Sequence, residues 1–88
     1  MFQGRPVEDV LKEMIVERLF LKVEPAAIGN EDKLMETYEV DSVRLLEIVV
    51  GLEEVFGVSL EDDEFSIERF ETVKAIAGLV REKLGQKA

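Results

Sequence analysis

Hydrophobic residues recur at helical spacing in three stretches of the chain. The first stretch begins after Pro6, which suits the first turn of a helix because its missing N–H would have no intrahelical partner there. Its apolar positions are Val7, Val10, Leu11, Met14, Ile15 and Leu19. Residues three and four apart share one face of a helix, so this spacing predicts a helix over residues 6–21.

The second stretch, residues 41–56, is the most hydrophobic of the three. Asp41 and Ser42 are good capping residues before it, and Gly57 is suited to end it. A helix that is apolar around so much of its circumference is either central to a bundle or has a second, partner-facing patch. The main stripe consists of Leu45, Ile48, Val49, Leu52, Val55 and Phe56, and the residues off its centre are Val43, Leu46 and Val50.

The third stretch begins after Thr72, which we expect to cap the last helix, and ends at Gly85. Before the second stretch, residues 22–40 form a long connection, and we expect Ile28 and Leu34 to pack from it onto the core. A short additional helix or packed segment is indicated by Phe65, Ile67 and Phe70. The pattern predicts an all-α fold, a small four-helix bundle with three main amphipathic helices and a short third one. We expect one domain over residues 1–88 with a core of about 6–85.

Composition limits the function. The chain has 88 residues, 20 acidic and 11 basic, with a net charge of −9, and it contains no cysteine or histidine. These counts exclude disulfides, thiolate or imidazole metal sites, and cysteine or histidine catalysis. The negative charge argues against nucleic-acid binding, and the sequence has neither an apolar run for a membrane span nor a secretion leader. We therefore expect a cytoplasmic monomer without nucleic-acid or membrane partners.

The acidic residues suggest neither a metal site nor an enzyme. A calcium loop that started at Glu61 would have Ser66 at its sixth position instead of glycine, and Thr72 at its twelfth instead of glutamate. Glu53 and Glu54 are adjacent, so their carboxylates point in different directions on a helix and cannot work as a pair. Fourteen acidic and three basic residues lie within 31–72, which makes this segment the expected face for a basic partner.

The Asp41-Ser42 pair lies at the start of the most hydrophobic helix. An exposed hydroxyl there could accept a phosphate ester, because the N–H groups and the dipole at a helix N-terminus favour negative charge. Taken alone, the pair is better explained as a helix cap.

The surrounding sequence favours the phosphate-ester site over a simple helix cap. The chain reads Glu-Val-Asp-Ser-Val at 39–43, Leu-Glu-Glu-Val-Phe at 52–56, Leu-Glu-Asp-Asp-Glu at 60–64 and Thr-Val at 72–73. This order resembles the acyl carrier proteins, whose pattern is Gly-x-Asp-Ser-Leu, then Leu-Glu-Glu-x-Phe, an acidic loop and Thr-Val. The resemblance covers about residues 7–84. The chain departs from the pattern at Glu39, Val43 and Arg44, where glycine, leucine and an acidic or polar residue are usual.

The resemblance implies a carrier and not an enzyme. A transferase would attach 4′-phosphopantetheine from coenzyme A to Ser42, with Asp41 as its motif neighbour. The thiol of that arm would hold acyl intermediates as thioesters, in fatty acid synthesis or a related specialised acyl or polyketide pathway. The alternative is an unmodified acidic helical module that binds basic partners.

The resemblance also implies two further sets of residues. Acyl-transferring, condensing or ligating enzymes with basic docking patches would recognise Val43, Arg44, Glu47, Val50, Glu53 and Glu54. An acyl chain would be sheltered by Leu45, Leu46, Val49, Leu52, Ile67, Val73 and Ile76, although the same residues are equally needed as bundle core.

Overall fold

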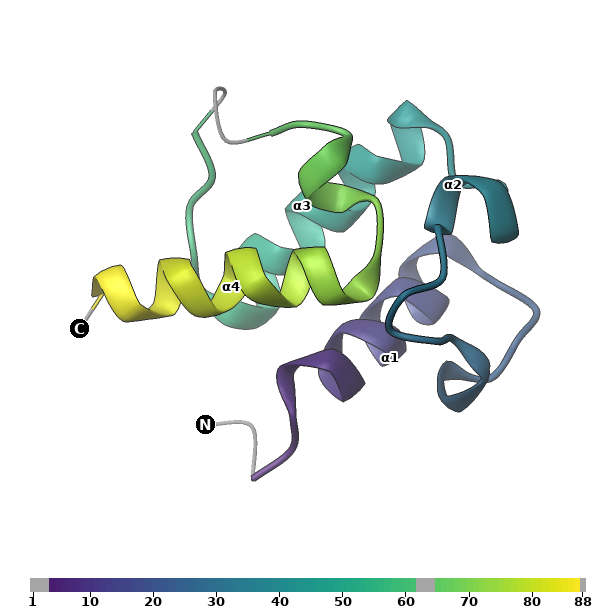
Figure 1. Ribbon diagram of the computed structural model, residues 1–88. Coiled ribbons are helices and arrows are strands. Elements are labelled where there is room, and N and C mark those ends of the chain that lie inside the picture. Colours follow the sequence, from purple (N-terminus) through teal and green to yellow (C-terminus); the bar gives the residue numbers. More distant parts are fainter. Residues whose placement is uncertain (1–3, 62–64, 88) are drawn as a thin grey trace.

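The computed structural model describes residues 4–61 and 65–87, and every regular element in this part of the chain is helical. Three long helices form the bundle: α1 (Val7–Leu19), α3 (Ser42–Phe56) and α4 (Val73–Lys87). The shorter elements are α2 (Leu34–Thr37) and the 3-10 turns η1 (Pro25–Ala27) and η3 (Glu68–Phe70). In Figure 1 the connection from α1 to α3 loops around one side of the bundle and carries α2. The predicted all-α four-helix bundle is confirmed.

Local capping signals in the sequence place three ends of the long helices. The side chain of Asp41 accepts a hydrogen bond from the backbone N–H of Arg44 at 2.8 Å, which makes it the N-cap of α3. Gly57 ends the same helix in the left-handed conformation, with φ 67°. The hydroxyl of Thr72 accepts from the N–H of Ala75 at 3.1 Å at the start of α4. All three caps are as predicted.

Two helix ends differ from the prediction. The expected end of α1 was residue 21, but the helix stops at Leu19 because Phe20 adopts the left-handed conformation, with φ 54°. Gly85 was expected to end α4, and the helix instead continues to Lys87. Gly85 does not adopt the positive φ that would break the helix there.

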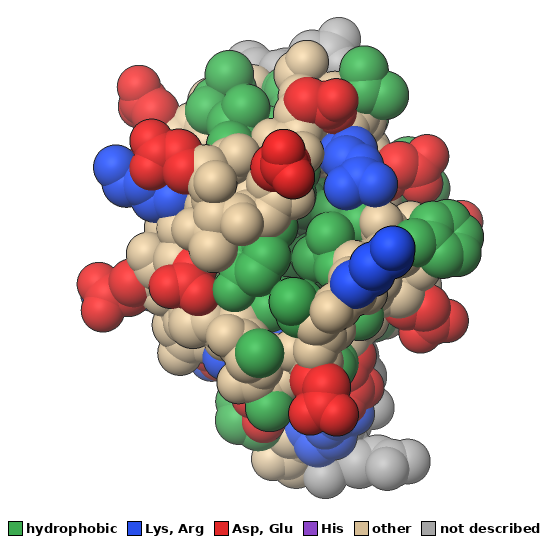
Figure 2. Space-filling model, turned by 90° about the vertical axis from the view of Figure 1, so that its right-hand side faces the viewer, with side chains coloured by type: hydrophobic (Ala, Val, Ile, Leu, Met, Phe, Trp, Pro, Cys, Tyr) green, Lys and Arg blue, Asp and Glu red, His purple; other side chains and the backbone are tan. Residues whose placement is uncertain are grey.

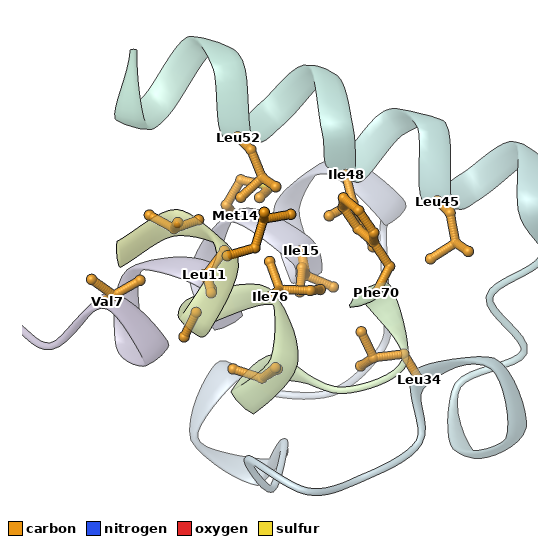
Figure 3. Close-up of a cluster of buried hydrophobic side chains, with 14 of the residues drawn as sticks. Val7, Leu11, Met14, Ile15, Leu34, Leu45, Ile48, Leu52, Phe70 and Ile76 are labelled. Atoms are coloured by element: carbon orange, nitrogen blue, oxygen red, sulfur yellow. The ribbon is translucent and has the colours of Figure 1, made fainter. Parts of the chain in front are cut away.

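Buried apolar side chains from the three long helices meet in one core. Figure 3 shows Leu11 and Ile15 of α1 beneath Ile48 and Leu52 of α3, with Phe70 of η3 beside them. No polar or charged side chain is buried in the described part of the chain. The described interior is therefore held together by apolar packing.

The long connection is tied to the rest of the fold. Ile28 and Leu34 are buried, as predicted. The backbone N–H of Leu34 donates to the carbonyl of Glu71, and the N–H of Lys74 donates to the carbonyl of Asn30, both at 2.9 Å. These bonds fix the connection against the start of α4, so the segment that leads into α3 has a defined path.

Candidate attachment site and docking helix

Ser42 is the first residue of α3, and its side chain is exposed. It lies between two fully buried anchors, Val40 and Leu45, which fix the backbone on either side. The first N–H groups of a helix have no intrahelical acceptor, and the helix dipole is positive at this end. The first turn of α3 contains no acidic residue. The geometry fits a phosphate ester on the hydroxyl of Ser42.

The turn before Ser42 is set by Glu39. Its φ is 54°, a left-handed value that glycine adopts more easily than other residues. Just before it, the hydroxyl of Tyr38 donates to the carboxylate of Asp32 at 3.0 Å. Burial, and then this hydrogen bond, raise the pKa of Tyr38 above its ordinary value. The backbone N–H of Gly29 donates to the same carboxylate at 2.8 Å, so Asp32 ties together the two ends of this part of the connection.

Arg44, which the sequence assigns to partner recognition, also makes a contact within the fold. Its side chain is half-buried, and its guanidinium donates from Nη2 to the carbonyl oxygen of Leu19 at 3.1 Å. Leu19 is the last residue of α1, where a positive charge is favourable. Arg44 thus connects the first turn of α3 to the end of α1.

The three glutamates that the sequence assigns to partner recognition are exposed, and each also has an intramolecular partner. The guanidinium of Arg18, on α1, forms an ion pair with Glu54 and lies 4.0 Å from Glu47. Glu53 accepts a hydrogen bond from the backbone N–H of Leu60 at 3.3 Å. The sequence gives no signal for Arg18, because its position depends on how α1 crosses α3.

The apolar residues assigned to recognition and to an acyl pocket separate into two groups. Val43, Leu46 and Val50 are 69, 53 and 43% exposed and form one outward-facing row on α3, which we call the apolar stripe. Ile67 is also about half exposed, and Val49 is half-buried. The fully buried members are Leu45, Leu52, Val73 and Ile76. The structure thus places Leu46 and Ile67 at the surface and four of the predicted pocket residues in the core.

A groove of about 560 Å³ lies elsewhere, along α1 and the end of α3. It is lined by Val10, Glu13, Met14, Glu17, Arg18, Phe20 and Val55. None of these residues was assigned to a site from the sequence. Hydrophobic side chains also gather at the centre of the face shown in Figure 2, with acidic and basic side chains around them.

The described residues contain neither a group of metal-ligating side chains nor a helix that could span a membrane. No three carboxylates there come together in a way that could hold a metal ion, and residues 62–64 of the acidic run lie outside them. Within the same ranges, no helix has the length and apolar character needed to span a bilayer.

A small helical bundle that buries no polar side chain in residues 4–61 and 65–87, and that presents an exposed serine at the start of a central helix, has the features of a carrier domain. The family model described as "Phosphopantetheine attachment site" matches residues 9–80. The chain is 35% identical over 79 residues to an acyl carrier protein of Campylobacter concisus (strain 13826), covering 90% of this chain and 95% of that one. It is 34% identical over 80 residues to that of Campylobacter curvus (strain 525.92), covering 91 and 97%.

A solved structure agrees with these relatives. The solution structure of a holo acyl carrier protein from Nitrosomonas europaea superposes with a TM-score of 0.80 at 27% identity, covering 92% of this chain and 99% of that one. The chain belongs to the acyl carrier protein family. Members of this family are carriers and not enzymes, and their cofactor is a covalently attached 4′-phosphopantetheine.

Proposed function

We propose that Ser42 is the residue that carries 4′-phosphopantetheine, and that the chain shuttles acyl intermediates as thioesters in fatty acid synthesis or a related specialised acyl or polyketide pathway. The observation that carries this proposal is the exposed hydroxyl of Ser42 at the N-terminus of α3. When bound, the group supplies a terminal thiol, which the chain itself lacks because it has no cysteine.

The residues around Ser42 have distinct roles in this proposal. Asp41 caps α3 and so holds the first turn in place. The free N–H groups of that turn and the helix dipole stabilise the negative charge of the phosphate. No group near Ser42 has to activate its hydroxyl, because the transferase supplies the base.

The partners we propose are a phosphopantetheinyl transferase and acyl-transferring, condensing or ligating enzymes with basic docking patches. They would meet α3 through Glu47, Glu53, Glu54 and the apolar stripe, whose exposed side chains suit a partner-facing surface. The interior set of Leu45, Leu52, Val73 and Ile76 lies between α3 and α4, where an acyl chain would be sheltered. We propose that the protein acts as a cytoplasmic monomer formed by one domain.

The experiment is to incubate the protein with coenzyme A, magnesium and a broad-specificity phosphopantetheinyl transferase, and to measure its intact mass. The wild type should gain the mass of one phosphopantetheine group, and Ser42→Ala should gain none. The two other serines of the chain, Ser59 and Ser66, provide matched controls, because Ser59→Ala and Ser66→Ala should both be loaded. A folded wild type that gains no mass would instead favour the unmodified interaction module.

A further inference from the structure

The strongest feature that the proposed function does not use is the position of Arg18. Its side chain is only 26% exposed, although it is one of the most hydrophilic in the chain. The guanidinium reaches from α1 to two carboxylates of α3, forming an ion pair with Glu54 and lying 4.0 Å from Glu47. Those glutamates are seven residues apart, which is two turns of the same helix face. One cation is therefore shared between both carboxylates.

Gly51 provides the space that Arg18 needs. It lies between Glu47 and Glu54 in the sequence and is buried against α1. A Cβ atom placed on Gly51 would lie 2.8 Å from Cδ and from Nε of Arg18, and 2.5 Å from Sδ of Met14. A Cβ at this position would require the side-chain ends of Met14 and Arg18 to move. The sequence of α3 thus includes both the carboxylates and the gap through which the cation reaches them.

This arrangement changes what α3 presents to a partner. A basic residue on a docking enzyme would have to compete with Arg18 for Glu47 and Glu54, since both carboxylates already have a partly desolvated counter-ion. The apolar stripe of Val43, Leu46 and Val50, in contrast, remains exposed. Two carboxylates of this helix thus have a counter-ion within the fold, whereas its apolar stripe is not covered.

We propose that Arg18 is a specificity-determining residue: an internal counter-ion that weakens docking by partners that recognise α3 through charge and favours partners that recognise its apolar stripe. The proposal rests on the proposed function, because it concerns the surface through which the carrier would be recognised. It adds a residue of α1 to that surface and gives it a role opposite to that of the glutamates.

The test compares Arg18→Gln with Arg81→Gln. Both changes remove one positive charge, but Arg81 forms its ion pair with Glu8, at 2.7 Å between α4 and α1, away from α3. The measured quantity is kcat/KM for loading of Ser42 by a transferase that has a basic docking surface. At low ionic strength, Arg18→Gln should raise this value about threefold or more. The gain should shrink as salt screens the freed carboxylates, and Arg81→Gln should stay close to the wild type.

A second measurement does not depend on loading. A lysine-rich helical peptide is titrated into each unmodified variant, with thermal unfolding to show that each is folded. Arg18→Gln should bind the peptide more tightly than Arg81→Gln does, and Gly51→Ala, which keeps the charge but displaces it, should shift in the same direction. Equal binding by Arg18→Gln and Arg81→Gln would overturn the proposal even if Ser42 is loaded. Tighter peptide binding by Arg18→Gln, together with no loading of the wild type, would support the counter-ion role of Arg18 and refute Ser42 as the attachment site.

Discussion

Replacing Phe20 with glycine should stabilise the protein, although the change removes a large hydrophobic side chain. Phe20 follows the last residue of α1 with φ 54° and ψ 41°, and its N–H donates to the carbonyl of Val16 as the helix cap requires. Left-handed backbone brings the Cβ atom of an L-residue close to the neighbouring carbonyl, whereas glycine has no Cβ atom. The side chain of Phe20 is 86% exposed, so little burial is lost.

Three contributions set the change in the free energy of unfolding for Phe20→Gly. Relief of the left-handed conformation contributes about 1–2 kcal/mol. The greater conformational freedom of glycine in the unfolded chain lowers the free energy of unfolding by about 0.4–1 kcal/mol. Loss of the small buried part of the ring lowers the free energy of unfolding by roughly 0.2–0.4 kcal/mol. The free energy of unfolding should therefore rise by about 0.5 kcal/mol, which for a chain of this size raises the melting temperature by about 2–4 °C.

The assay is urea and thermal unfolding of the unmodified protein, followed by far-ultraviolet circular dichroism. Phe20→Ala is the matched control, because it removes the ring but keeps the Cβ atom, and it should be no more stable than the wild type. If Phe20→Gly is no more stable than Phe20→Ala, the backbone at this position is not strained and the reasoning fails.

Three further predictions concern packing and charge. Gly78→Ala, where nothing lies within 4 Å of the new Cβ, should raise the free energy of unfolding by about 0.5–1 kcal/mol. Gly51→Ala should be less stable than Gly78→Ala, because the side-chain ends of Met14 and Arg18 must move away from the new Cβ. Equal effects in urea unfolding would contradict the close approach at Gly51. Arg44→Met should cost about 1–2 kcal/mol, because it removes the charged hydrogen bond to the end of α1, and unchanged stability would refute that contact. The hydrogen bond from Arg81 holds the pKa of Glu8 below its ordinary value. A carboxyl whose pKa is lowered on folding stabilises the fold at neutral pH and loses that effect as the pH falls through its folded pKa. The difference in unfolding free energy between wild type and Glu8→Gln should therefore narrow as the pH falls below the ordinary glutamate pKa of about 4.3, and a difference independent of pH would show that the pair does not form.

The sequence predicts the parts of this fold that depend on local chemistry. Asp41, Gly57 and Thr72 cap their helices as expected, because a cap is decided by residues within one turn of it. Two helix ends are exceptions. Phe20 takes a conformation in which glycine would be expected, so its side chain gives no local signal for the end of α1. Gly85 stays within α4 instead of ending it.

The features of the candidate site also divide into those that the sequence predicts and those that depend on how the helices pack. The exposed position of Ser42 follows from the order of motif residues along the chain. The partners of Arg18 and Arg44 do not, because each reaches a residue of another helix, and only the crossing of α1 and α3 brings them together. The sequence therefore identifies the charged residues of α3 but not which of their charges are already matched within the fold.

The central claim is that Ser42 carries the prosthetic group, and peptide mapping of the loaded protein tests it most directly. Cleavage after Lys33 and Arg44 releases residues 34–44, a peptide in which Ser42 is the only serine. After incubation with coenzyme A and the transferase, this peptide should gain the mass of one phosphopantetheine group, and fragmentation should locate the gain on Ser42. An unmodified 34–44 peptide from a folded, transferase-treated protein, or a gain located on a peptide that contains Ser59 or Ser66, would contradict the claim.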